Sequence, residues 1–89
     1  MEYTIEWNRK AKKDLKSLDN SIRQQIMRFI NKLERAEDPK VFGKQLTGDL
    51  TGYWSYRVGD YRIVADIQDD KLIILIVAVD HRRKVYAIS

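Results

Sequence analysis

The chain has 89 residues, of which 44% are hydrophobic and 34% charged, and its 17 lysines and arginines outnumber 13 acidic residues to give a net charge of +4. This length supports one domain over residues 1–89 with a single modest core. The absence of cysteine excludes a disulfide framework, and no apolar run approaches the roughly 20 residues that span a bilayer, so we expect a cytoplasmic protein with no membrane partner.

The chain begins with a predicted strand and a short basic helix. Residues 2–7 alternate between polar and apolar side chains, the period of a half-buried strand. Asn8 is a suitable N-cap for an amphipathic helix over residues 9–18. Acidic neighbours nearly cancel the charge of its outer face, so we expect a solvated helix face made of Arg9, Lys10, Lys12, Lys13 and Lys16.

A second helix is predicted to begin at residues 19–21 and to end at Asp38-Pro39, because the residue before proline disfavours helical geometry. The short connection favours a helical hairpin lying over one face of a sheet. Residues 39–52 are expected to form a loop, in which Lys44 is either an exposed structural lysine or an additional phosphate contact.

Residues 53–66 predict a β-hairpin with Gly59-Asp60 as a two-residue turn. In this register Arg57 lies opposite Arg62 on one face of the hairpin. The other face is a predicted core face, made of Trp54, Tyr56, Val58, Tyr61, Ile63, Ala65 and Ile67.

Two interpretations of the arginine pair remain open. Like charges directly opposite on a sheet are destabilising, which favours a site visited by an anion. Alternatively, both side chains extend into water or pair with acidic residues, for which the candidates are Asp60, Asp66 and Asp80.

Residues 72–79 are continuously apolar, which predicts a central strand covered on both faces. Two helices can cover only one of these faces. The C-terminal segment, a partner protein or both must therefore lie on the other. Residues 80–89 are long enough for about one turn of helix or a short edge strand.

The residue types with chemical potential are basic or aromatic, and we infer no metal site and no cofactor. One histidine without cysteine does not make a typical zinc site. Guanidinium groups can hold a scissile phosphate, a histidine or tyrosine can move a proton, and an exposed ring such as Tyr53 can stack on a base. This pattern suits metal-free cleavage of RNA, with the candidates Arg57, Arg62, His81, Arg82, Arg83 and Tyr86.

Over nearly its whole length the chain resembles the RelE/ParE superfamily of toxins from toxin–antitoxin pairs. Three features carry the resemblance. The first is the order of elements: strand, helix, helix and three strands. The second is the run from Leu46 to Ile63, with its glycines, Tyr53-Trp54 and Arg57-Val58-Gly59-Asp60-Tyr61-Arg62, and the third is the ending His81-Arg82-Arg83-x-Val85-Tyr86. It implies an α+β fold: one small domain with an N-terminal strand, a helical hairpin and a three-stranded antiparallel meander, with the helices packed on one sheet face.

The ending is more typical of RelE-like members, which implies a ribosome-dependent endoribonuclease that cuts messenger RNA in the A site through attack of the 2′-hydroxyl. By position, Arg62 and Arg82 would hold the phosphate and balance charge in the transition state, and Tyr86 would orient the nucleophile or share in proton transfer. Arg57 and Arg83 would be further phosphate contacts.

One departure concerns the general base. Well-known RelE members carry two lysines at the start of the second strand, where this chain has no basic residue between Tyr53 and Tyr56. His81 is the candidate substitute. The departure also keeps two alternatives open: a ParE-like poison of DNA gyrase, and a catalytically inert member that only binds an antitoxin.

The resemblance implies two partners, messenger RNA on the ribosome and a small acidic antitoxin of the RelB type, with which toxins of this kind form complexes such as heterotetramers. An acidic amphipathic segment would also neutralise the arginines and cover the apolar strand 72–79.

Overall fold

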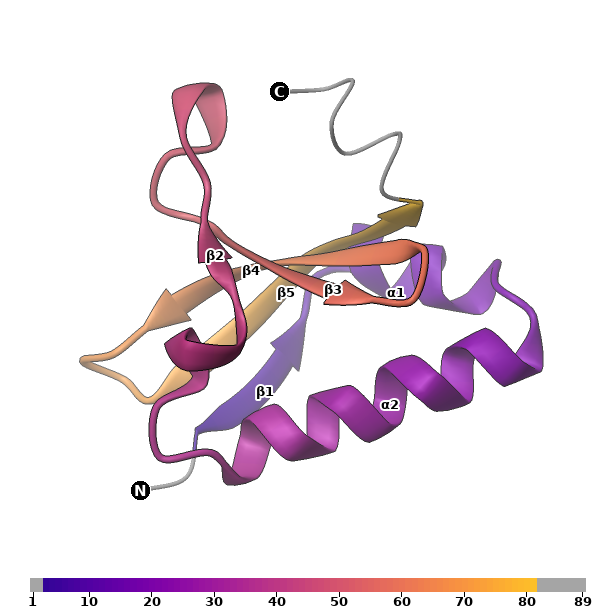
Figure 1. The fold of residues 1–89 in the computed structure, drawn as a ribbon, viewed down its shortest axis with the longest axis horizontal. Coiled ribbons are helices and arrows are strands. Elements are labelled where there is room, and N and C mark those ends of the chain that lie inside the picture. The colour runs from indigo at the N-terminus through magenta and orange to yellow at the C-terminus, as the bar shows by residue number, and fades with distance from the viewer. Residues whose placement is uncertain (1–2, 82–89) are drawn as a thin grey trace.

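The computed structural model describes residues 3–81, which form one mixed sheet and two helices (Figure 1). The strands lie in the order β1-β5-β4-β3-β2. Two short 3-10 helices, η1 and η2, flank β2. The elements in chain order are β1 (Thr4–Trp7), α1 (Arg9–Lys16), α2 (Asn20–Arg35), η1 (Pro39–Phe42), β2 (Lys44–Gln45), η2 (Gly48–Leu50), β3 (Trp54–Val58), β4 (Tyr61–Gln68) and β5 (Ile73–His81).

The first strand and both helices form where their sequence patterns predict them. The Asn8 side chain caps α1 by accepting a 2.8 Å hydrogen bond from the amide of Ala11, which confirms the predicted N-cap. Helix α2 ends at Arg35, three residues before Asp38, and Pro39 then begins η1. Within residues 3–81, no helix is long and apolar enough to cross a membrane.

The β3–β4 hairpin has the predicted register. Arg57 is paired with Arg62, and Val58 with Tyr61, on either side of a two-residue turn. Gly59 has a φ of 59°, a left-handed conformation that glycine adopts without steric cost. The turn therefore fixes which side chains of the two strands share a face.

Strand β5 is an interior strand, as its apolar composition predicts. It pairs antiparallel with β4 along its whole length and parallel with β1 over Ile73 to Ile76 only. Beyond that point the carboxylate of Asp14, on α1, accepts a 3.0 Å hydrogen bond from the amide of Val79. Beyond the end of β1, helix α1 thus supplies the hydrogen-bond acceptor for a backbone donor at the edge of β5.

The segment 39–52 is more ordered than the predicted loop. Its residues Lys44 and Gln45 form the short edge strand β2, paired with Ser55 and Trp54 of β3. A two-residue strand is too short to leave a periodic pattern in the sequence. Gly43 allows this pairing because a Cβ there would lie 2.8 Å from the Ser55 carbonyl oxygen.

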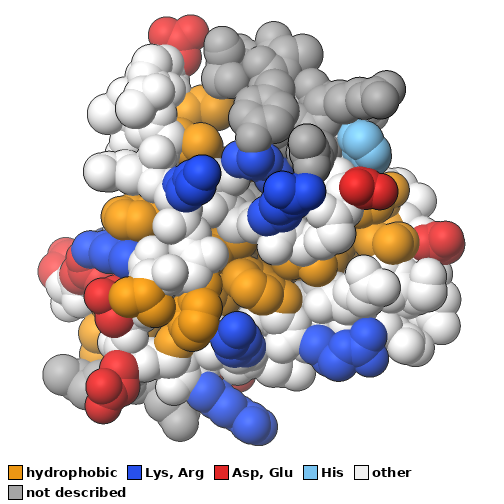
Figure 2. Space-filling view, viewed as in Figure 1, with side chains coloured by type: hydrophobic (Ala, Val, Ile, Leu, Met, Phe, Trp, Pro, Cys, Tyr) orange, Lys and Arg blue, Asp and Glu red, His pale blue; other side chains and the backbone are white. Residues whose placement is uncertain are grey.

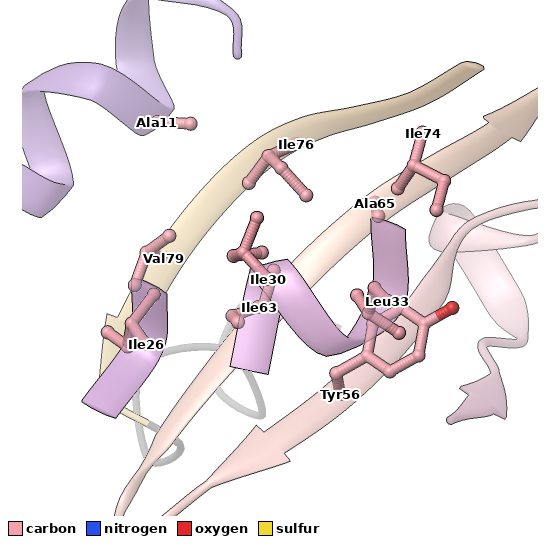
Figure 3. Close-up of a cluster of buried hydrophobic side chains, with 10 residues drawn as sticks. All are labelled: Ala11, Ile26, Ile30, Leu33, Tyr56, Ile63, Ala65, Ile74, Ile76 and Val79. Atoms are coloured by element: carbon pink, nitrogen blue, oxygen red, sulfur yellow. The ribbon is translucent and has the colours of Figure 1, made fainter. Parts of the chain in front are cut away.

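The core lies between the helices and one face of the sheet (Figure 3). Helix residues such as Ile26 and Leu33 pack against alternate residues of β3, β4 and β5, including Tyr56 and Ile63, all with no exposed surface. The Tyr56 hydroxyl donates a 2.8 Å hydrogen bond to the Pro39 carbonyl, so its polar atom is satisfied inside the core. The opposite, outer face of the sheet is left for other contacts.

Candidate functional site

Arg57 and Arg62 lie side by side on the outer face, on β3 and β4. They are held differently. The Arg62 guanidinium donates a 3.0 Å hydrogen bond from Nη1 to the hydroxyl of Ser55, a residue only 4% exposed. Arg57 is exposed, and its Nε donates a long 3.4 Å bond to the Gly59 carbonyl at the turn. Arg62 is thus the more closely held cation of the pair and Arg57 the more exposed one.

Both arginines line a hollow of about 370 Å³, together with a third cation, Lys44. It is lined by Val41, Phe42, Gly43, Lys44, Ser55, Arg57 and Arg62, and we call it the cationic hollow. Lys44 reaches it because β2 pairs with β3 at Ser55. None of these described lining residues is acidic, and Figure 2 shows lysine and arginine side chains gathered near β2 and the β3–β4 hairpin.

Two of the three acidic residues considered as partners for the arginines, Asp66 and Asp80, have other contacts. Asp80 forms an ion pair with Lys10 at 3.2 Å, and Asp66 accepts a 3.0 Å hydrogen bond from Gln68. The three ion pairs within residues 3–81 do not include Arg57 or Lys44. Within residues 3–81, Arg57 and Lys44 therefore form no ion pair, and their positive charge suits an anion such as a phosphate group.

Tyr53 lies beside the cationic hollow, in a separate apolar groove. The groove has a volume of about 230 Å³ and is lined by Lys10, Leu50, Tyr53, Val64, Val77, Ala78 and Asp80. Val64 is paired with Ser55 of the cationic hollow, so the two depressions adjoin on the outer face. A register shift at Val64 and Ala65 displaces β5 locally and brings Val77 into the groove.

His81 is not among the residues that line either depression. It is paired with Tyr61 in the register, and the two rings meet edge to face with centroids 5.5 Å apart. Because side chains alternate along a strand, His81 shares the sheet face of Tyr61, whereas Arg62 and Asp80 share the other. Arg82, Arg83 and Tyr86 lie outside the described residues.

The tyrosines with shifted pKa values are structural. Burial raises the pKa of Tyr56 well above its usual range, and a hydrogen bond to Asp69 raises the pKa of Tyr3 to about 12. Both phenols therefore stay protonated at neutral pH and serve as hydrogen-bond donors. In the part of the chain that the structure describes, no group of three or more acidic or histidine side chains is placed to hold a metal ion.

Sequence reasoning found the cations of the site and missed what positions them. Ser55 gives no signal as a buried partner of Arg62, because a serine between two aromatic residues is ordinary in a strand. The apolar groove also depends on the irregular register of β4 and β5. Side chains alternate along a strand, and this rule, applied to residues 78–81, would have placed His81 and Arg62 on different faces of the sheet.

Comparison with known proteins gives one consistent family. A family model described as the ParE toxin of type II toxin–antitoxin systems matches residues 5–86. Toxin RelG of Mycobacterium tuberculosis is 34% identical over 87 residues, covering 97% of this chain and 98% of that protein. The mRNA interferase toxin RelE of Escherichia coli is 25% identical, covering 94% of this chain and 87% of that protein.

A solved structure with the same sequence identity as Toxin RelG, 34%, shares the fold. The toxin–antitoxin complex RelBE2 from Mycobacterium tuberculosis contains a chain that is 34% identical and superposes with a TM-score of 0.83. The match covers 92% of the chain described above and 100% of the chain in that complex.

Proposed function

The chain belongs to the RelE/ParE family of toxins from type II toxin–antitoxin systems, and we propose that it acts as a ribosome-dependent endoribonuclease that cuts messenger RNA in the A site. The observation that carries the proposal is the cationic hollow, in which Lys44, Arg57 and Arg62 line one space without an acidic side chain among the described lining residues. Phosphate oxygens are the natural ligands of such a site.

The chemistry is an internal displacement at phosphorus. The 2′-oxygen forms a bond to the adjacent phosphorus while the bond to the 5′-oxygen of the next nucleotide breaks, leaving a 2′,3′-cyclic phosphate. A base takes the 2′-hydroxyl proton, and an acid gives a proton to the departing 5′-oxygen. Negative charge builds on the phosphate oxygens in the transition state, where preoriented cations stabilise it most.

Arg62 is proposed as the main transition-state contact because its guanidinium is oriented by Ser55 before substrate arrives. Arg57 and Lys44 are proposed as accessory phosphate contacts. Arg82 and Arg83, outside the described residues, are proposed as further cations that contact the phosphate. Tyr86, also outside the described residues, is proposed to take part in proton transfer. Tyr53, in the adjoining groove, is proposed to stack on a base.

His81 is proposed as the general base in place of the lysines found in well-known RelE members. Its ring contacts Tyr61 on the sheet face opposite Arg62. For His81 to reach a 2′-hydroxyl whose phosphate is held by Arg62, the RNA strand must pass around the end of β5.

An antitoxin is the second proposed partner. The related chain from Mycobacterium tuberculosis was solved in a toxin–antitoxin complex. On this chain, the apolar groove and the cationic hollow adjoin on the outer face, so one acidic amphipathic segment can cover apolar side chains and neutralise arginines together. Such a segment would block the proposed phosphate site.

The second candidate function is poisoning of DNA gyrase, which is favoured by the match to the ParE toxin model over residues 5–86. The two functions separate in a purified translation system. A ribonuclease gives new 5′ ends in a primer-extension map of ribosome-bound message. A gyrase poison leaves the message intact and inhibits supercoiling by purified gyrase.

A further inference from the structure

The exposed side of α1 carries a second concentration of positive charge, apart from the sheet. Its four side chains are all exposed and line a hollow of about 370 Å³, formed by Arg9, Lys12, Lys13 and Lys16. Their spacing of three and four residues places them on one side of the helix, with neighbouring Cβ atoms about 5–6 Å apart. We call this surface the α1 basic face.

No residue of the α1 basic face forms an ion pair within the described part of the chain. The ion pairs of residues 3–81 are Lys10–Asp14, Lys10–Asp80 and Lys40–Asp69, and none includes a residue of this face. Asp14, the acidic residue of the same helix, contacts Lys10 and the amide of Val79. Like charges four residues apart destabilise a helix, and an anionic partner would offset that cost.

We propose that the α1 basic face binds the phosphate backbone of folded RNA, as a docking contact separate from the cationic hollow. The proposal rests on the proposed function and deepens it by adding a second RNA surface. Every residue that lines the face is cationic, whereas the centre of a protein interface is apolar and aromatic. Nucleic-acid interfaces are polar and positively charged, so folded RNA fits better than an acidic protein.

The fold fixes the position of this face relative to the cationic hollow. Lys10 of α1 binds Asp80 of β5 at 3.2 Å, and Asp80 is paired with Arg62 of β4. Asp14 holds α1 against the same strand. RNA held by the α1 basic face therefore presents a ribosome-bound message to the arginines at a constant distance, which is what a site-specific cut requires.

The test is RNA binding by the full chain, measured by fluorescence anisotropy with a labelled RNA hairpin over a series of salt concentrations. The variant Lys12→Gln/Lys16→Gln removes two charges from the face. The matched control, Arg28→Gln/Lys71→Gln, removes two charges from exposed positions on α2 and the β4–β5 turn. We expect the first variant to bind about 10-fold more weakly at low salt and to lower the salt slope by about two, and the control to keep the wild-type slope.

Equal weakening of both variants, or wild-type binding by Lys12→Gln/Lys16→Gln, would overturn the proposal. Loss of antitoxin affinity with unchanged hairpin affinity would overturn it too, because the face would then be a protein interface. If the first variant loses hairpin binding and the wild type does not cut ribosome-bound message, the docking surface stands and the ribonuclease proposal fails.

Discussion

Ser55 of β3 and Arg62 of β4 are diagonal neighbours on the outer face of the hairpin, and the serine hydroxyl accepts a 3.0 Å hydrogen bond from the guanidinium. The bond is partly buried, and it joins a neutral acceptor to a permanent cation. Arg62 lines the cationic hollow together with Lys44 and Arg57. We regard Ser55 as the positioning residue of the site.

Ser55→Ala should therefore slow cleavage by about 10-fold without unfolding the domain, because a hydrogen bond to a charged group contributes about 1.5–3 kcal/mol. Ser55→Thr keeps the hydroxyl and should restore most of the rate. Single-turnover cleavage of ribosome-bound message measures both variants, with circular dichroism as a check on folding. A Thr variant as slow as the Ala variant would show that packing, not the hydroxyl, matters at this position.

His81→Gln tests the proposed general base. If His81 accepts the 2′-hydroxyl proton, the variant should cut RNA about 100-fold or more slowly, within the range for loss of a general base. Tyr61→Leu, which removes the ring contact and keeps the imidazole, is the control. Full toxicity of His81→Gln in cells would remove His81 from the mechanism.

The apolar groove gives a prediction for antitoxin binding. Leu50, in η2, is half-buried and lines the groove but not the cationic hollow. Leu50→Asp places a carboxylate where an acidic amphipathic segment would dock, and should weaken the complex with the cognate antitoxin at least about 10-fold. Met27→Asp, an exposed apolar position on α2, should leave it unchanged. Calorimetric titration with purified antitoxin distinguishes the two, and equal affinities would place the antitoxin elsewhere.

The bond between Tyr3 and Asp69 predicts how stability depends on alkaline pH. It raises the pKa of Tyr3 to about 12, whereas an unfolded tyrosine titrates near pH 10. The folded state thus holds the phenol proton more tightly, so this stabilisation is complete below about pH 10 and is lost as pH rises toward 12.

Tyr3→Phe should reduce that alkaline decline in the free energy of unfolding, measured by urea titration at a series of pH values, and the part caused by the raised pKa of Tyr56 should remain. Tyr61→Phe, a half-buried tyrosine whose ring contacts His81, serves as the control and should retain the decline. A wild-type decline in the Tyr3→Phe variant would mean that other groups carry the alkaline response.

Local rules account for much of this fold. The hairpin register follows from a two-residue turn with Gly59 in the left-handed region, and that register alone places Arg57 beside Arg62. The cap of α1 follows from Asn8 in the same way. These features depend on residues close together in the chain, which is where sequence patterns are informative.

The features that sequence reasoning missed depend on distant contacts. The parallel pairing of β1 with β5 joins the two ends of the described chain, and β2 exists only because Gly43 lets the backbone approach β3. The register shift near Val64 likewise arises from the fit between two strands. Such pairings are decided by tertiary packing, so no short window of the sequence reports them.

The most direct test of the central claim is a primer-extension map of a defined message in a purified translation system, comparing the wild type with Arg62→Ala and Arg82→Ala. Arg28→Ala, on the exposed side of α2, is the control for lost charge. We predict cuts only on ribosome-bound message, reduced about 100-fold or more in the Arg62 and Arg82 variants and retained in the control. Intact message at toxin levels that arrest growth would contradict the ribonuclease account and favour gyrase as the target.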